Sequence, residues 1–160
     1  MKILVLQGPN LNRLGRRNPE KYGRQTLADI EADIELCAAE LGVQAEQFQS
    51  NHEGELLDWL HARQDHEDAI IVNPAGLTYY GWSLYDALCD TRLPIAIVHI
   101  AQFWSHEKGR RPDIFADLAT VHVAGLGWQG YRHALQALVD LHGAKAAGTG
   151  HQVAAAGSHR

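Results

Sequence analysis

Five short, strongly apolar runs recur along the chain and constrain its fold more than any other feature of the sequence. They cover residues 2–7, 43–48, 69–73, 95–100 and 120–124. Nearly continuous runs of aliphatic and β-branched residues are typical of strands that are buried on both faces, as in a parallel sheet. The pattern therefore predicts five short strands, of which the second (VQAEQF) is the weakest because it is the most polar.

Amphipathic segments separate these runs. They cover residues 26–41, 53–63, 82–91 and 128–142. In the first segment, Thr26 stands where a helix N-cap is expected and Gly42 stands where the helix should end. The alternation of strand and helix predicts one doubly wound α/β domain with right-handed crossovers over residues 1–145. Residues 146–160 are small and polar without a pattern, and we expect a disordered tail there.

The composition argues against several classes of protein. A chain of 160 residues can bury one sizeable core, and its net charge of -5 comes without a concentrated basic surface for nucleic acid. No apolar run approaches the roughly 20 residues that cross a bilayer, so no membrane association is expected. Cys37 and Cys89 lie in helical patterns and are expected to be buried, reduced thiols, as in a cytoplasmic protein. The ten histidines are scattered without ligand spacing, so we expect no metal.

In a doubly wound sheet, ligands bind beyond the carboxyl ends of the strands. That rule selects the segments after the first four strands, residues 9–23, 50–53, 73–81 and 99–111. Asn10 lies in the first segment, within a turn where side-chain amides also serve a purely structural role. The glycines of these segments do not form a nucleotide-binding motif, so no nucleotide cofactor is expected.

The first segment contains the stretch LGRRNPEKYG, which brings two arginines close to Tyr22. A phenol has an ordinary pKa of about 10 and is a poor base at neutral pH unless a nearby cation stabilises its ionised form. Arg16 and Arg17 can supply that cation if the segment folds over a pocket; otherwise the tyrosine only packs its ring and the arginines are solvated. His99, at the end of a buried strand, is either a proton donor or a core histidine. Arg110 either binds an anion or a diol, or is a surface charge.

Two longer motifs, GPNLNRLGRRNPEKYG and SNHEGELLDWLH, are followed in order by NPAGLT, VHI and RR. This series, over residues 2–143, resembles the type II 3-dehydroquinate dehydratases. The resemblance implies a flavodoxin-like fold, a homo-oligomer built from trimers (usually a dodecamer), and a place in the shikimate pathway of aromatic amino acid biosynthesis. It also implies elimination of water from a cyclic β-hydroxy ketone with neither metal nor cofactor.

The same resemblance assigns catalytic roles. Tyr22, as a phenolate stabilised by Arg17, matches the base that removes a proton next to the ketone. Asn10 matches the asparagine that holds a water near the developing enolate, and His99 matches the acid that protonates the departing hydroxyl. A base, an acid and a partner for the oxyanion make physical sense of the residue types present.

Further positions match substrate-binding residues of the family. Asn73 corresponds to a residue that positions both the substrate and the acid histidine, and Arg110 to the arginine that reaches the ring hydroxyls. Asp86 corresponds to an aspartate that is contributed to a neighbouring subunit's site. The backbone amides of Ile100 and Ala101 can bind an anionic substrate group.

The sequence departs from the family mainly on the substrate side. Ile97 replaces the glutamate that pairs with the acid histidine, so we expect a positive charge on His99 to be less favoured and the ring to be loosely oriented. Ala101 replaces a serine that helps to bind the substrate carboxylate, and Tyr79 replaces a histidine that contacts substrate. The other departures are Asn18, Tyr85, Gln102, Trp104, Pro112 and Asp113. Several aromatic side chains around one pocket indicate a site reshaped for a flatter or less polar ligand.

Three functions follow from these observations. The first is a lyase of the dehydroquinase type that acts on 3-dehydroquinate with reduced or modified efficiency. The second is a specialised relative that uses Tyr22 and Arg17 for enolisation, dehydration or cyclisation of a less polar carbonyl compound in secondary metabolism. The third, a catalytically silent binding subunit, is disfavoured because Tyr22, Arg17 and His99 occur together.

Overall fold

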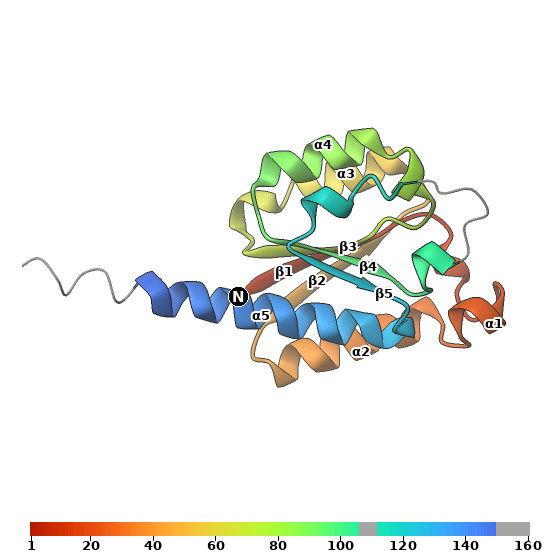
Figure 1. Ribbon diagram of the computed structural model, residues 1–160, viewed down its shortest axis with the longest axis horizontal. Helices are drawn as coiled ribbons and strands as arrows, with labels where there is room; N and C mark the ends of the chain where they lie inside the picture. Colours follow the sequence, from red (N-terminus) through yellow and green to blue (C-terminus); the bar gives the residue numbers. More distant parts are fainter. Residues whose placement is uncertain (106–111, 150–160) are drawn as a thin grey trace, which may run out of the picture.

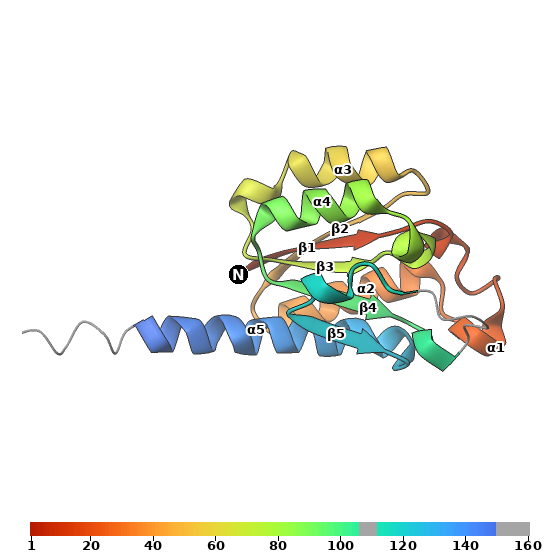
Figure 2. The same cartoon turned by 45° about the horizontal axis from the view of Figure 1, so that its top comes forward.

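The computed structural model describes residues 1–105 and 112–149, which form a five-stranded, all-parallel sheet (Figures 1 and 2). The strands are β1 (Lys2–Gln7), β2 (Gln44–Gln49), β3 (Ala69–Asn73), β4 (Ile95–His99) and β5 (Val121–Ala124). Their order in the sheet is β2-β1-β3-β4-β5, the order of a flavodoxin-like doubly wound fold. The predicted fold class is therefore confirmed, and the predicted strands are displaced by no more than one residue at either end.

Two helices cover each face of the sheet, as Figures 1 and 2 show. On one face lie α2 (Leu27–Glu40) and α5 (Gly130–Thr149), and on the other lie α3 (Glu53–His61) and α4 (Trp82–Thr91). Helix α5 continues past its predicted end at residue 142 and includes the first four residues of the predicted tail. Residues 150–160, the rest of that tail, lie outside the described residues.

The start of α2 agrees with its sequence signal. The Thr26 hydroxyl accepts a hydrogen bond from the Asp29 amide at 3.2 Å, and the Asp29 carboxylate accepts one from the Thr26 amide at 2.8 Å. This reciprocal capping box satisfies two backbone donors that the first turn of a helix leaves unpaired. The hydrogen bonds from the Thr26 amide and hydroxyl lower the pKa of the Asp29 carboxyl.

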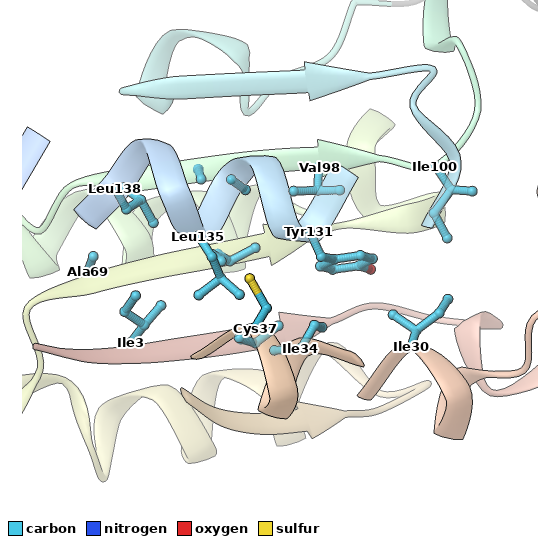
Figure 3. Packing of buried hydrophobic residues seen from close by; sticks show 14 of the residues in the cluster. Ile3, Ile30, Ile34, Cys37, Ala69, Val98, Ile100, Tyr131, Leu135 and Leu138 are labelled. Carbon is cyan, nitrogen blue, oxygen red and sulfur yellow. The ribbon is translucent and has the colours of Figure 1, made fainter. Parts of the chain in front are cut away.

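The two faces of the sheet bury separate apolar clusters because successive strand residues point to opposite sides. Ile3, Val5 and Val98 pack against α2 and α5, and Figure 3 shows Cys37, Tyr131 and other residues of those helices directed at the strands. The opposite cluster, with α3 and α4, contains these strand residues: Leu4, Leu6, Ile70, Val72, Ile95 and Ile97.

Both cysteines are free thiols, and only one of them is buried. Cys37 lies in the core, where burial raises the pKa of its thiol. Cys89 is exposed on α4, so the prediction that both thiols are buried is wrong for Cys89. Within the part of the chain that the structure describes, no helix combines the length and the apolarity needed to cross a membrane.

Short helical turns connect the main elements at the carboxyl edge of the sheet. A four-residue helix, α1 (Pro19–Tyr22), lies within the stretch that the sequence analysis treated as a loop. The 3-10 turns are η1 (Leu11–Arg13), η2 (Gln64–His66), η3 (Ala75–Tyr79), η4 (Phe103–Ser105), η5 (Ala116–Leu118) and η6 (Gly127–Gln129). Of these, α1, η1, η3 and η4 contribute residues to the wall of the cavity described next.

Candidate active site

A cavity of about 290 Å³ lies beyond the carboxyl ends of β1, β3 and β4. This is where a doubly wound sheet is expected to bind ligands. Of the ten site residues that the sequence predicted, eight line the cavity: Tyr22, Arg17, His99, Asn10, Asn73, Tyr79, Ile100 and Ala101. The fold thus brings together residues that are up to 91 positions apart in the chain, as Asn10 and Ala101 are.

For the other two predicted residues, the structure places one away from the cavity and does not describe the other. Asp86 is exposed on the outer surface of α4 and does not line the cavity. Arg110 lies outside the described residues.

The segment that carries Tyr22 is organised as a single helical turn. Asn18 precedes this turn with a left-handed backbone (φ 37°), Pro19 occupies its first turn, and Gly23 ends it with φ 85°. The half-buried Tyr22 ring has the Arg17 guanidinium 5.4 Å and the Lys21 ammonium 5.2 Å from its centroid. Two cations therefore lie over the ring of one phenol, at distances typical of cation–π contacts. The sequence predicted the arginine and missed Lys21.

Asn10 is held in place by the segment after β2. Its backbone is left-handed (φ 68°), and its amide donates a 2.8 Å hydrogen bond to the Asn51 side-chain oxygen. Gln49 donates to the same oxygen at 3.2 Å, which couples the ends of β1 and β2. Asn51 lies in the SNHEGE motif, so this part of the motif holds the backbone of Asn10 in place from outside the cavity.

The next residues of that motif anchor neighbouring elements. Ser50 donates to Glu55 and accepts from the His52 amide, and Glu53 accepts from the Leu84 amide at 3.0 Å near the start of α4. These hydrogen bonds tie the start of α3 to the turn before it and to α4. The residues are therefore structural supports of the site, a role that their sequence pattern did not distinguish from ligand binding.

At the end of β3, Asn73 belongs to a buried polar network. Its side-chain amide donates to the Tyr131 hydroxyl at 2.9 Å, and that hydroxyl donates to Gln7 at 2.9 Å. The Asn73 oxygen accepts from the Ala75 amide at 3.2 Å. Burial raises the pKa of the Tyr131 hydroxyl, so this group stays neutral and orients Asn73. Gln7 and Tyr131 were missed by the sequence analysis, because they lie inside elements that were treated as core.

Beside Asn73, the backbone at Gly8 lies very close to the backbone at Pro74. A Cβ atom on Gly8 would lie 2.4 Å from the Pro74 carbonyl oxygen, so only glycine fits at the end of β1. Ala75, on the cavity wall, has a left-handed backbone (φ 50°) that side chains disfavour. Such strain persists where the surrounding structure holds the backbone in place, and it is common at binding sites.

At the end of β4, His99 is buried and its ring is held by a carboxylate. His99 Nε2 lies 2.7 Å from Asp113 Oδ2, and His122 Nε2 lies 3.1 Å from the same oxygen. The other Asp113 oxygen accepts from the Phe115 amide at 2.9 Å. Burial raises the pKa of the Asp113 carboxyl, but hydrogen bonds from His122 and His99 outweigh burial and hold it well below its ordinary range.

This arrangement corrects one prediction. The presence of Ile97 led us to expect that His99 lacks a carboxylate partner and is loosely oriented. Asp113 supplies that partner from a segment that follows β4, and it does so in hydrogen-bonded contact. The prediction failed because it considered only the neighbouring position on the same strand, whereas the partner reaches the histidine through the tertiary fold.

The same three residues are of the types that bind metal ions. One ligand atom from each of His99, Asp113 and His122 lies within 4.8 Å of the others. Both imidazoles share a single carboxylate oxygen at 2.7 and 3.1 Å, which are ordinary hydrogen-bond lengths. We therefore describe this group as a hydrogen-bonded cluster, and the absence of a metal stays a prediction.

One wall of the cavity is aromatic. The Phe103 ring stacks on His99 with centroids 4.8 Å apart and on Tyr79 with centroids 5.8 Å apart. Trp104 packs edge-on against Phe103 and contacts His122, yet it remains largely exposed. Tyr79 was predicted to alter the pocket, whereas the contribution of Phe103 was not recognised.

A parallel sheet of order β2-β1-β3-β4-β5, with a phenol, two cations and an imidazole around a cavity at its carboxyl edge, defines a flavodoxin-like α/β enzyme. Comparison with known families makes the assignment specific. Residues 1–139 match the family described as dehydroquinase class II, and the chain belongs to this family. It is accordingly an enzyme of the hydro-lyase class.

Individual relatives agree with this assignment. The 3-dehydroquinate dehydratase of Roseiflexus castenholzii is 48% identical over 143 residues, which cover 89% of this chain and 91% of that protein. The enzyme of the same name from Bacillus subtilis is 40% identical over 141 residues, covering 88% and 95%. The crystal structure of the type II dehydroquinase from Propionibacterium acnes superposes with a TM-score of 0.82 at 37% identity, covering 87% of this chain and 96% of that one.

Proposed function

We propose that this protein is a type II 3-dehydroquinate dehydratase, which eliminates water from 3-dehydroquinate through an enolate. One observation carries the proposal: a phenol with two cations over its ring and a carboxylate-held imidazole line the same cavity. This pairing provides a base and an acid in one site. The names of relatives at 40–48% identity support the choice of substrate.

The chemistry follows from the placement of these groups. The Tyr22 phenolate, stabilised by Arg17 and Lys21, removes the proton next to the ketone, and the electron pair passes to the carbonyl oxygen as an enolate. A water held by Asn10 stabilises that enolate by hydrogen bonding. When the enolate collapses, the bond between carbon and the β-hydroxyl breaks, and His99 gives a proton to the leaving oxygen. Water and the conjugated enone are the products.

Substrate binding is shared among groups around the cavity. The backbone amides of Ile100 and Ala101 bind the substrate carboxylate, and Asn73, fixed by Tyr131, positions the ring. Arg110 is proposed to reach the ring hydroxyls. The reaction would place the enzyme in the shikimate pathway, in the cytoplasm.

The outer surface of α4 supports a homo-oligomer built from trimers, with a dodecamer as the expected form. Asp86 is exposed there, away from its own cavity, as expected for a residue that serves a neighbour. Tyr80 and Trp82 are also largely exposed at the start of α4, and large aromatic side chains are enriched at subunit interfaces.

The aromatic wall favours a second candidate function. Tyr79 and Phe103 stack beside His99, and Ala101 offers no hydroxyl, so this side of the cavity has fewer hydrogen-bond donors for a polyhydroxylated acid. A flatter, less polar carbonyl compound of secondary metabolism is the alternative substrate. The same base and acid would act on it by enolisation, dehydration or cyclisation.

The test is the appearance of enone absorbance when the purified protein is mixed with 3-dehydroquinate. We expect turnover by the wild type and a fall in kcat of at least about 100-fold in Tyr22→Phe, because a general base contributes that much. Tyr80→Phe, which removes an exposed hydroxyl outside the cavity, is the matched control and should retain activity. Folded wild-type protein without turnover would refute the substrate, and full activity of Tyr22→Phe would refute the base.

A further inference from the structure

We propose that Asp113 is a positioning residue for His99, whose tautomer and orientation it sets, and that His122 also contacts this carboxylate. The inference rests on the proposed function, because it concerns the acid of that reaction. It adds two residues, Asp113 and His122, that are neither predicted site residues nor part of the cavity wall.

The contacts of Asp113 are those of a rigid acceptor. Its side chain is 1% exposed, so it exchanges little with water. One oxygen accepts from two imidazoles and the other accepts from the Phe115 amide. The next residue, Ile114, donates its amide to the Thr78 carbonyl at 3.1 Å, which fixes this segment to the turn that forms the cavity wall.

The ionised carboxylate determines where the protons of His99 reside. A carboxylate can only accept hydrogen bonds, so Nε2 of each contacting imidazole must carry hydrogen. In neutral His99 the single ring proton is then on Nε2, and the second proton of the charged ring is on Nδ1. Within residues 1–105 and 112–149, no hydrogen bond is formed to Nδ1. The proton available for transfer is therefore the one on Nδ1.

The assignment of the His99 protons matters because charged groups lie on both sides of the ring. On the cavity side, the wall carries the described titratable side chains of Arg17, Lys21, Tyr22 and Tyr79, and two of these are cations. On the sheet side Asp113 is the compensating negative charge, and the second imidazole shares it. Without that carboxylate, a protonated His99 would face two cations with no partner.

Strand register provides a way to move the carboxylate. Ile97 lies directly opposite His122 in the ladder between β4 and β5, and residues 97 and 99 point to the same face of β4. A glutamate at position 97 would therefore lie beside both imidazoles. The substitution Ile97→Glu can replace the negative charge that Asp113→Asn removes.

The first experiment is nitrogen-15 NMR of the histidine rings near pH 8. This measurement does not depend on turnover. We expect wild-type His99 to be the Nε2–H tautomer. In Asp113→Asn the backbone N–H of Phe115 still donates to the side-chain oxygen, so the new NH₂ group faces the imidazoles. Because NH₂ is a donor, Nε2 of His99 must accept, and the ring proton moves to Nδ1. Asp117→Asn, an equal loss of charge in the following turn, should leave the spectrum unchanged. An Nδ1–H tautomer in the wild type overturns the proposal, whether or not the variant folds.

The second experiment is kinetic. With 3-dehydroquinate we expect Asp113→Asn to lower kcat by about 100-fold with KM almost unchanged, because an acid in the wrong tautomer cannot protonate the leaving group. Adding Ile97→Glu should recover at least part of kcat, a rescue that a merely structural role would not give. A kcat equal to that of the wild type in folded Asp113→Asn would overturn the proposal. It would also be overturned if the wild type contained one zinc ion per chain and lost its activity when that zinc was removed. The expected tautomers in a protein without turnover would refute the proposed function alone.

Discussion

The role of Asp113 depends on the residues that surround it in space, not on its neighbours in the sequence. Ile97 and Asp113 are both departures from the family pattern, and Ile97 considered alone predicts that His99 has no carboxylate partner. In the structure Asp113 contacts His99 and His122, so a negative charge is still present beside His99. Two departures from the family pattern are therefore complementary, and the charge has moved from a strand to the segment after it.

The lowered pKa of Asp113 predicts how stability depends on pH. An unfolded aspartate titrates near 3.9, and the folded carboxyl titrates below that value. Its contribution to stability is thus complete above the unfolded pKa and is lost as the pH falls through the folded one. At pH 7 we expect Asp113→Asn to lower the free energy of unfolding by about 2 kcal/mol, the value of hydrogen bonds to a charged group.

Urea unfolding at several pH values between 7 and 2 measures this effect. The difference between wild type and Asp113→Asn should shrink below about pH 4, because the wild-type carboxylate is protonated on unfolding there. Asp117→Asn serves as the control and should differ little from wild type at every pH, since its carboxylate is exposed. A difference that grows as the pH falls below 4 would contradict the assignment.

At the scale of elements, the site depends on connections between the ends of strands. The segment after β1 carries Asn10 in a left-handed conformation, and the segment after β2 holds it through Asn51. Asn51 does not line the cavity, so we expect it to affect catalysis only through the position of Asn10. Specific sequence motifs can thus reflect the need to hold a loop as much as the need to bind a ligand.

This connection makes a prediction about Asn51. Asn51→Ala removes the acceptor for the Asn10 amide, and we expect kcat/KM to fall by about tenfold or more because the catalytic geometry is lost. Thermal unfolding should change little, since the hydrogen bond is exposed. Asn51→Asp keeps an oxygen at the same position and should restore most of the activity. Equal losses in both variants would mean that this hydrogen bond does not position Asn10.

At the scale of the whole molecule, the exposed surface of α4 raises the question whether each active site contains residues from two subunits. If Asp86 serves a neighbouring cavity, Asp86→Asn and Tyr22→Phe inactivate different halves of one composite site. Co-expressed subunits of the two variants should then regain about a quarter of wild-type activity, the fraction of sites with both native residues in a randomly mixed oligomer.

The measurement compares the mixed preparation with each variant alone, after size-exclusion chromatography has established that mixed oligomers form. Co-expression of Tyr80→Phe with Tyr22→Phe controls for dilution, because Tyr80→Phe leaves both proposed site residues native. Mixed oligomers with no more activity than the separate Tyr22→Phe and Asp86→Asn preparations would show that Asp86 does not act across subunits.

The sequence by itself determined the order of strands and helices, the N-cap at Thr26 and the segments that border the cavity. These properties are local or follow from the topology of parallel sheets: apolar runs predict buried strands, and their carboxyl ends define the ligand edge. Its motifs also identified Tyr22, Arg17 and His99, which the structure brings to one cavity.

Only the tertiary structure decided which groups surround those residues. Asp113 and His122 reach His99 from separate elements, and Tyr131 fixes Asn73 from a helix 58 positions away. Such contacts depend on how side chains pack when distant segments meet, and no spacing along the chain encodes them. The physical reason is that hydrogen bonds and charges act through distances in space, which the fold sets and the sequence order does not.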